Sequence, residues 1–516
     1  MKLSKIAIAC SLAFAAGSAA AADESAGYTK ILLSGATAPD NFMQSISTSM
    51  LNNVTSFRDA ATRFRAFRGD AKPGIVSPAG GEKVVIQKRS KGGSVWGVDP
   101  VARANRIEVI DFNACVNDPD PNWDFVCGMK GIDPDIAGNA SPTNPGEVAD
   151  FGVSDVEPAM FQEPYNTEND QPALTASERD RMQSFPVNQL MMGIVTTNAV
   201  PDTLNLSRSE YGAMLTKNGV TSWDLIDPTI DPGTDYAQVV VCRRVEGSGT
   251  QTSYNWFFNN FPCQTPAGGS TEPARVTDSD GYGSGAGTVA DPILVDPTAG
   301  YTVVENSTSG DVRNCLTRAQ TLTDHNVVGS NDRNYRIQFS RGLLANGGLG
   351  KPFRAVGTLS LDSYNSANVN WYFRPLDGAG RYNAATQTCA SASCTGSVPS
   401  KANLLNGKYD FTVELTMQVR TVDVTNPNGD LVRSINHPTN ALKRTFITRF
   451  ITNAGDPVYT GDTTGLLNSV PNAYASIPLQ EIAGEFVGFD PYDAANAGKV
   501  SFYSRSANTC APMRRF

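Results

Sequence analysis

The sequence predicts an α/β protein with two or more domains. A chain of 516 residues is too long to fold around one hydrophobic core. Along it, short β-branched runs repeatedly lead into turns rich in glycine and serine, and these turns lead into segments with helical spacing of apolar residues. Units of strand, small-residue turn and helix start are typical of α/β folds.

Two such units lie near the amino terminus. Lys30–Leu33 is an apolar strand that leads into the small-residue turn Ser34–Pro39, and Asp40–Leu51 has the apolar spacing of an amphipathic helix. In the second unit, Glu82–Lys88 alternates as a strand and leads into the glycine-rich turn Lys91–Gly97. Each unit therefore places small residues at the end of a strand.

Three further strands are expected before the middle of the chain. Arg106–Phe112 is one, and Val148–Met160 contains a second that ends at Ser154 and Asp155. An aspartate at the carboxyl end of a strand is either a ligand or the N-cap of the following element. Phe185–Thr197 is mostly apolar, as expected for a strand that is buried on both faces.

The most informative unit is Val239–Phe258. It begins with three valines that predict a strand, continues through Arg243, Arg244 and a Gly-Ser-Gly turn, and enters a helix at Thr250. The first backbone N–H groups of a helix have no partner within it, and the helix dipole favours negative charge there. The unit therefore predicts an anion site. The alternative is an ordinary strand-to-helix turn with an N-cap serine and surface arginines.

The other expected elements are less regular. We expect helices at Leu206–Thr216, Thr221–Leu225, Ser309–Ala319 and Leu479–Glu485, strands at Arg333–Phe339, Lys351–Phe373 and Tyr409–Val424, and long loops at Gln264–Thr308 and Gly378–Ser400. The strict alternation of Tyr409–Val424 predicts an antiparallel, half-exposed strand. Arg444–Thr452 fits a helix or a strand.

Met1–Ala22 has the features of a secretory signal: two lysines, an apolar run and a small-residue cleavage site. Cys10 lies within it, so eight of the nine cysteines remain in the exported chain, an even number that indicates disulfides in an oxidising compartment. The favoured pairs are Cys115–Cys127, Cys242–Cys263 and Cys389–Cys394, which leave Cys315 and Cys510; other connectivities stay open. Metal binding is less favoured because the chain has no C-x-x-C motif and two histidines.

The net charge is −9 at pH 7, and −11 once the two signal lysines are removed. An acidic chain without a basic run argues against nucleic-acid binding. It leaves binding of a small anion open, because such a ligand responds to local donors.

Asp111, Asp118, Asp120 and Asp124 suggest a calcium site, but their spacing does not fit an EF-hand, and a solvated, disulfide-closed loop is favoured. No stretch after the signal is long and apolar enough to span a bilayer.

Five segments, taken in order, resemble the periplasmic phosphate-binding proteins of bacterial phosphate ABC transporters, which have the type II periplasmic-binding fold. The segments are S-G-A-T-A-P (Ser34–Pro39), the G-G-S turn that ends at Ser94, A-D-F-G-V-S-D (Ala149–Asp155), R-R-V-E-G-S-G-T (Arg243–Thr250) and Y-A-S-I-P (Tyr474–Pro478). Phe185–Asn198 also resembles the strand that crosses between the lobes of that family.

The resemblance implies a metal-free oxyanion cage without cofactor or catalytic residues. Its phosphate-binding residues would be Thr37, Ala38, Ser94, Asp155, Arg244, Ser248, Gly249 and Thr250. Arg244 would neutralise the anion through a bidentate fork. An ionised Asp155 can only accept hydrogen bonds, so it would select an anion that still carries a proton, such as hydrogen phosphate or arsenate, over sulfate.

The resemblance also implies a two-lobe α/β fold with a ligand cleft between the lobes and inserted disulfide-closed loops. Residues 23–186 and 408–516 would form the first lobe, and residues 187–407 the second. We therefore expect a monomeric, non-enzymatic, periplasmic or secreted protein that captures inorganic phosphate for an ABC-transporter permease. The alternatives are a secreted or surface-associated binding protein of this fold with another ligand or none, and a secreted hydrolase. The hydrolase is disfavoured because no G-x-S-x-G motif occurs.

Three features depart from the family pattern. Glu246 stands where the family has an aspartate that pairs with the arginine, so its longer side chain could displace Arg244. Trp96 stands where small residues are expected and could narrow the cleft. The segment between Ser94 and Ala149 is far longer than in the family.

Overall fold

The computed structural model describes residues 23–131, 145–168, 171–233, 236–264, 267, 269, 271–331, 333–343, 350–364, 370–384, 386–389, 394–461, 471–482 and 484–516. The predicted signal, residues 1–22, lies outside the described residues. Across the described ranges, no helix is both long and apolar enough to cross a membrane.

One large mixed sheet organises the molecule. Among the described residues its main path runs in the order β13 (Thr302–Asn306), β11 (Val240–Arg244), β16 (Ala355–Ser360), β10 (Met182–Thr197), β20 (Thr412–Arg420), β9 (Phe151–Ser154), β1 (Thr29–Gly35), β4 (Lys83–Arg89), β3 (Phe64–Ala71), β2 (Leu51–Arg58), β7 (Phe125–Lys130) and β6 (Val109–Asn117). Beside this path, β17 (Trp371–Phe373) and β23 (Tyr474–Ser476) also pair with β10, and β18 (Tyr382–Asn383) and β19 (Thr388–Cys389) continue from β17.

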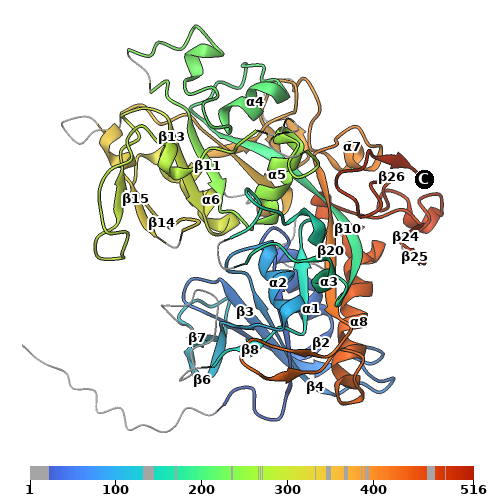
Figure 1. Ribbon diagram of the computed structural model, residues 1–516. Helices are drawn as coiled ribbons and strands as arrows, with labels where there is room; N and C mark the ends of the chain where they lie inside the picture. Colours follow the sequence, from blue (N-terminus) through green and yellow to red (C-terminus); the bar gives the residue numbers. More distant parts are fainter. Residues whose placement is uncertain are drawn as a thin grey trace, which may run out of the picture.

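The long strand β10 joins two lobes. Residues 182–191 of β10 pair with β20, and residues 192–196 pair with β16. In the first lobe the order is β4-β1-β9-β20-β10, and in the second it is β13-β11-β16-β10-β17. In both orders three parallel strands are followed by an antiparallel strand and then by a strand in the original direction. Figure 1 shows the first lobe in blue below and the second in green and yellow above, with β10 and β20 running between them.

Helices cover both lobes. They are α1 (Asp40–Ser49), α2 (Asp99–Arg103), α3 (Ala176–Arg179), α4 (Arg208–Met214), α5 (Gly249–Asn259), α6 (Ser309–Thr321), α7 (Lys401–Leu405), α8 (Ala441–Gly455) and α9 (Pro457–Gly461). α1 buries Phe42, Met43 and Ile46, the apolar stripe that its spacing predicts. α6 begins with a capping box in which Thr308 and Asp311 satisfy each other's backbone N–H groups.

The remaining strands form small sheets outside the main one. They are β5 (Arg106–Ile107) with β8 (Glu147–Val148), β12 (Ile293–Val295) with β14 (His325–Val328) and β15 (Asn334–Ile337), β21 (Val424–Thr425) with β22 (Leu431–Val432), β24 (Gln480–Ile482) with β25 (Glu485–Val487), and β26 (Tyr503–Ser504) with β27 (Arg514–Arg515). The predicted α/β class is therefore confirmed. The residue boundaries proposed for the two lobes remain a prediction.

Several local expectations were wrong. Gln480–Ile482 and Glu485–Val487 pair as β24 and β25 where a helix was expected at Leu479–Glu485, and Gln264–Thr308 contains β12 and β13. All nine residues of β20 are buried, so the expected half-exposed strand is incorrect. β20 lies between β9 and β10, and its polar Glu414 accepts hydrogen bonds from Ser504 Oγ and the Arg505 backbone N–H, both at 2.7 Å.

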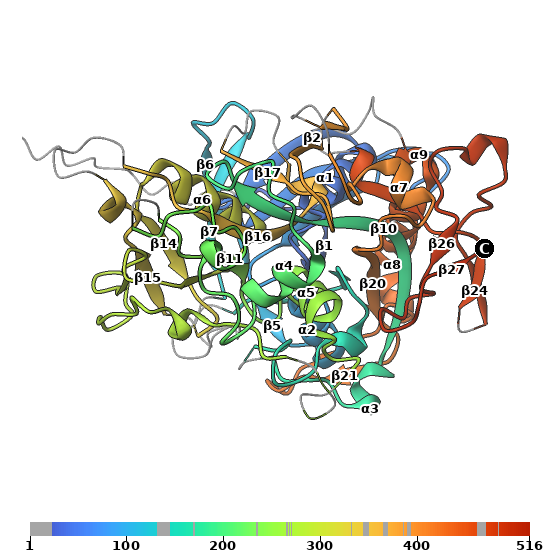
Figure 2. The same cartoon turned by 90° about the horizontal axis from the view of Figure 1, so that it is seen from above.

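The carboxyl-terminal segment, residues 471–482 and 484–516, covers β10 and β20 and so keeps β20 from solvent. Its strands lie beside β10 in both ribbon views (Figures 1 and 2). Tyr503 O accepts a hydrogen bond from Gln189 Nε2 of β10 at 2.7 Å, and β23 pairs directly with β10. Alternation along Tyr409–Val424 therefore did not indicate a solvent-exposed face, because the end of the chain satisfies the polar side chains there.

Four disulfides link the described cysteines. Cys115–Cys127 and Cys389–Cys394 are confirmed, whereas the favoured pair Cys242–Cys263 is wrong. Cys242 bonds Cys315, and Cys263 bonds Cys510. The Cα atoms of these pairs lie 6.0 and 5.4 Å apart, within the range that a disulfide allows, so β11 is joined to α6 and the segment after α5 is joined to the carboxyl-terminal tail.

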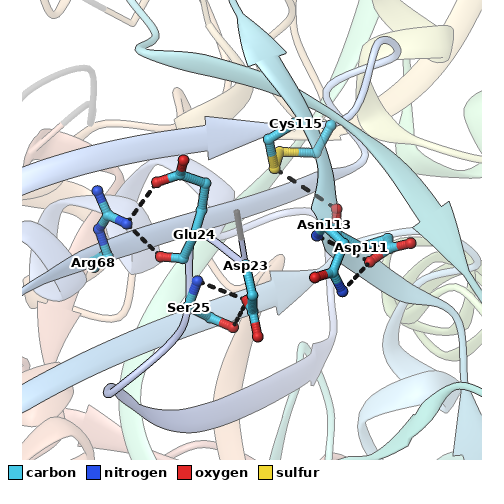
Figure 3. Close-up of a disulfide and its surroundings, with 8 residues drawn as sticks. Asp23, Glu24, Ser25, Arg68, Asp111, Asn113 and Cys115 are labelled. Atoms are coloured by element: carbon cyan, nitrogen blue, oxygen red, sulfur yellow. Dashed lines mark hydrogen bonds and ion pairs between the residues drawn. A yellow bond between two sulfur atoms is a disulfide. The ribbon is translucent and has the colours of Figure 1, made fainter. Parts of the chain in front are cut away.

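The hairpin β6–β7 carries the Cys115–Cys127 disulfide, and the amino-terminal end of the described chain lies against it (Figure 3). Glu24 accepts a hydrogen bond from Arg68 Nη1 at 2.8 Å, and Asp111 O lies 3.7 Å from Cys115 Sγ. Asp118 pairs with Arg58 of β2, with Arg58 Nη2 2.9 Å from Asp118 Oδ1. Among the described residues, no cluster of three or more acidic, histidine or cysteine side chains could hold a metal ion.

Removal of the Cys242–Cys315 disulfide is expected to destabilise the protein more than removal of Cys389–Cys394. The bonds close segments of 73 and 5 residues, so the chain-entropy model gives losses of about 4 and about 2 kcal/mol. Urea unfolding of the two double alanine variants would measure this order. Equal losses would show that closure of the long segment is not the main contribution.

Candidate anion-binding site

The predicted cage residues come from four turns that meet where the lobes face each other. Thr37 and Ala38 lie between β1 and α1, and Ser94 begins a short 3-10 helix, Ser94–Gly97, after β4. Asp155 follows β9, and Ser248 is the N-cap of α5, whose first two residues are Gly249 and Thr250. With Arg244 at the end of β11, all are buried. The carboxyl ends of parallel strands gather these turns, as is usual for ligand sites in α/β folds.

Arg244 bridges the two lobes. Its Nη1 donates to Thr37 Oγ1 of the first lobe at 2.7 Å, and its Nε and Nη2 donate to the backbone oxygens of Asn306 and Ser307 at 3.0 and 2.8 Å. The side chain is 1 % exposed, and burial lowers the pKa of Arg244 to about 10, against the opposing effect of Asp155. The guanidinium therefore stays charged at neutral pH, with neutral oxygens as its hydrogen-bond partners.

Asp155 supplies the negative counterpart. Its backbone N–H donates to Ser94 Oγ at 3.2 Å, and Thr250 Oγ1 donates to Asp155 Oδ2 at 3.4 Å. Asp155 Oδ1 is buried and has no hydrogen-bond partner among the described residues. Burial raises the pKa of Asp155 to about 6, while the charge of Arg244 and the hydrogen bond with Ser94 act in the other direction.

The amino terminus of α5 closes the cage from the second lobe. Ser248 occupies the N-cap position, yet its hydroxyl makes no capping bond and has no partner among the described residues. A side chain at Gly249 would clash, because an added Cβ would lie 2.3 Å from Ser94 Oγ and 2.6 Å from Asp155 Cβ. The hydroxyl of Ser248 and the first N–H groups of α5 are thus available to an anion.

A fifth turn was missed by the sequence analysis. Ser309, the first residue of α6, has its Oγ 3.2 Å from Thr37 Oγ1 and accepts from Arg244 Nη1 at 3.3 Å. Its surroundings repeat the strand, small-residue turn and helix pattern, because β13 leads through Ser307 and Thr308 into α6. That pattern was the available signal: a helix at Ser309–Ala319 was expected, but the strand and turn before it were assigned to the long loop Gln264–Thr308.

Glu246 and Trp96, two residues that differ from the family pattern, make their contacts outside the cage. Glu246 does not pair with Arg244; its Oε1 lies 3.1 Å from Arg275 Nη2. Trp96 does not line the cleft, because its ring lies against the Arg89 guanidinium at 3.9 Å and its Nε1 donates to Glu168 at 3.0 Å. Glu246 therefore does not displace Arg244, and Trp96 does not narrow the cleft.

A cleft between the lobes opens beside the cage. It has a volume of about 230 Å³, and Thr37, Ala38 and Ser309 form part of its wall. The described atoms thus place donors, one buried cation and one buried carboxyl on adjoining turns, and Thr37 and Ser309 lie between Arg244 and the cleft. Their role in binding phosphate remains a prediction.

No family model matches the chain, and no curated protein matches it. Solved structures give distant matches. A phosphate ABC transporter substrate-binding protein from Clostridium perfringens is 11 % identical, with 85 % of this chain and 95 % of that chain covered and a TM-score of 0.36. An ancestral soluble variant of the human phosphate-binding protein is 13 % identical, with 93 % and 98 % covered and a TM-score of 0.37. A high-affinity periplasmic phosphate-binding protein is 13 % identical, with 91 % and 96 % covered and a TM-score of 0.34.

Asp155→Asn is expected to stabilise the ligand-free protein at neutral pH. The folded-state pKa of about 6 lies above the ordinary value of 3.8, so the ionised carboxyl costs folding free energy above pH 6. The variant should be more stable by roughly 3 kcal/mol at pH 8, and the gain should fade between pH 6 and pH 4. Urea unfolding at pH 4, 6 and 8 would measure it, with the exposed Asp490→Asn as control. A gain that does not change with pH would contradict the assignment.

Proposed function

We propose that this protein is a non-enzymatic phosphate-binding protein that is exported and delivers phosphate to an ABC-type permease. One observation carries the proposal: a buried Asp155 oxygen and the buried Ser248 hydroxyl lack partners among the described residues and belong to the same turns that hold the buried Arg244. Unpaired buried polar groups are costly, so such a group of atoms is typical of a ligand site.

The chemistry of this set favours a protonated oxyanion. Arg244 compensates the negative charge, while Ser248, Thr250 and the first N–H groups of α5 can donate to the oxygens. The carboxyl of Asp155, once ionised, can only accept, so it needs a ligand oxygen that carries hydrogen. Hydrogen phosphate and arsenate meet this requirement and sulfate does not.

Binding without catalysis is supported by the positions of the two histidines. His325 Nε2 lies 2.9 Å from Asn306 Oδ1, and burial lowers the pKa of His325 to about 4. His437 Nδ1 lies 2.8 Å from Thr439 Oγ1, and the contact is exposed. The His437 contact is local, between residues two apart in the sequence, and among the described residues neither imidazole hydrogen-bonds a serine or cysteine side chain.

Export is supported by the covalent chemistry. The four disulfides among the described residues indicate an oxidising compartment, and Met1–Ala22 has the pattern of a secretory signal. A monomer that presents its cleft to a permease fits the two-lobe architecture, since closure of lobes around a ligand is a common means of sequestering it.

Arg244→Ala should lower phosphate affinity by at least about 100-fold, because it removes the buried positive charge and a hydrogen bond across the lobes. Isothermal titration of the purified, phosphate-free protein would measure the change. Arg275→Ala is the matched control, because Arg275 pairs with Glu246 outside the cage. This variant should bind phosphate with the affinity of the unaltered protein. Unchanged phosphate affinity in Arg244→Ala would refute the proposed site.

Asp155→Asn should relax the selection against sulfate. The amide supplies an N–H donor where the carboxylate can only accept, so a fully ionised oxyanion is no longer opposed there. The unaltered protein should show no heat with sulfate, whereas the variant should bind sulfate and phosphate within about tenfold of each other. Competition titration at pH 7.5 would measure the ratio. Persistent rejection of sulfate by the variant would assign the selectivity to other groups.

A further inference from the structure

The cleft beside the cage has room for a bound group. Its volume is about 230 Å³, whereas a space of roughly 10–15 Å³ on the same measure holds one water molecule. Both lobes form it: Asp40 and the β2–β3 turn around Arg63 on one side, and the start of α6 and residues after β16 on the other. The space can therefore hold a group in addition to an anion in the cage.

Three arginines converge on this cleft. Arg63, Arg65 and Arg313 all contribute to its wall, while its carboxylates are Asp40 and Asp362. Asp40 Oδ1 already accepts from Lys88 Nζ at 2.6 Å and from Ser90 Oγ at 2.8 Å. The cleft is therefore lined by more positive than negative charge.

Two of these arginines are poorly compensated. Arg65 Nη1 donates to the neutral Gln44 Oε1 at 3.1 Å, its Nε is buried without a partner among the described residues, and Arg313 Nη1 donates to Ser363 O at 3.3 Å. Arg63 Nη2 lies 3.9 Å from Asp311 Oδ2, an ion pair. Among the described residues, neither Arg65 nor Arg313 forms an ion pair. Burial, and next the charge of Arg65, lowers the pKa of Arg313, while the charges of Asp362, Asp40 and Asp311 act in the other direction. Like charges held together in this way favour an anion between them.

The cleft and the cage share a wall. Thr37 and Ser309 both line the cleft, and both accept hydrogen bonds from Arg244 Nη1, at 2.7 and 3.3 Å. The helix dipole at the start of α6 adds positive potential at this wall. One ligand can therefore contact the shared hydroxyls and reach donors on both sides of them.

We propose that the cleft is a second anion subsite, so that the protein binds a diphosphate-type ligand with one phosphoryl group in the Arg244 cage and the other between Arg65 and Arg313. This inference rests on the proposed function, because it assigns the first phosphoryl group to that cage. The ligand class is an anion that carries a terminal phosphoryl group and a second negative group joined to it through one bridging atom, as in a diphosphate.

Titration with inorganic diphosphate, inorganic phosphate and glycerol phosphate in metal-free buffer tests the subsite. The unaltered protein should bind diphosphate most tightly. Arg65→Gln/Arg313→Gln should weaken diphosphate binding by at least about 30-fold, because charge-assisted contacts each contribute roughly tenfold or more, and should change phosphate binding by less than about threefold. The control Arg514→Gln/Arg515→Gln removes two exposed charges at the carboxyl terminus and should change neither affinity.

Thermal unfolding of each variant establishes that it is folded, and Arg63→Gln serves as the second cleft variant if the double variant is not. Diphosphate that fails to bind a phosphate-binding protein would overturn the subsite and leave the proposed function standing. Equal losses for phosphate and diphosphate, or glycerol phosphate bound as tightly as diphosphate, would also overturn it, since charge in the cleft would not be what is recognised. Binding of none of the three would overturn the proposed function as well.

Discussion

The structure depends on keeping one guanidinium charged inside the protein. Arg244 is almost fully buried, and transferring a charge out of water is costly unless donors and counter-charges compensate. The compensation comes from backbone oxygens at the end of β13, from the Thr37 hydroxyl on the other lobe, and from the nearby Asp155. Both lobes must meet closely to provide it, so the position of the cage and the approach of the lobes are set by the same interaction.

The parts of the site that the sequence could predict are those with a local cause. Gly247 has φ of +76° and Gly93 has φ of +99°, conformations that glycine adopts easily, and each precedes a serine of the cage. Buried strands before such turns are also visible in a short window. The four turns that hold Thr37, Ser94, Asp155 and Ser248 could therefore be placed before the fold was known.

What could not be predicted depends on contacts between distant segments. The pairing of Cys263 with Cys510 spans 247 residues, and burial of β20 requires the carboxyl-terminal tail to cover it. Arg65 and Arg313 are neighbours because the β2–β3 hairpin of one lobe faces α6 of the other, and the sequence analysis assigned no role to either. The repeated strand order of the two lobes is likewise a property of topology, without any repeat in the sequence.

The disulfide between Cys242 and Cys315 has a mechanical consequence. It fastens β11, which carries Arg244, to α6, which begins at Ser309, so these two walls form one crosslinked half of the cage. Opening of the cage would have to break the hydrogen bonds that cross it, from Arg244 and Ser309 to Thr37, from Thr250 to Asp155 and from the Val95 N–H to Gly247 O. A ligand leaving through that opening would part from Ser94 and Asp155 while the opposite half kept its shape.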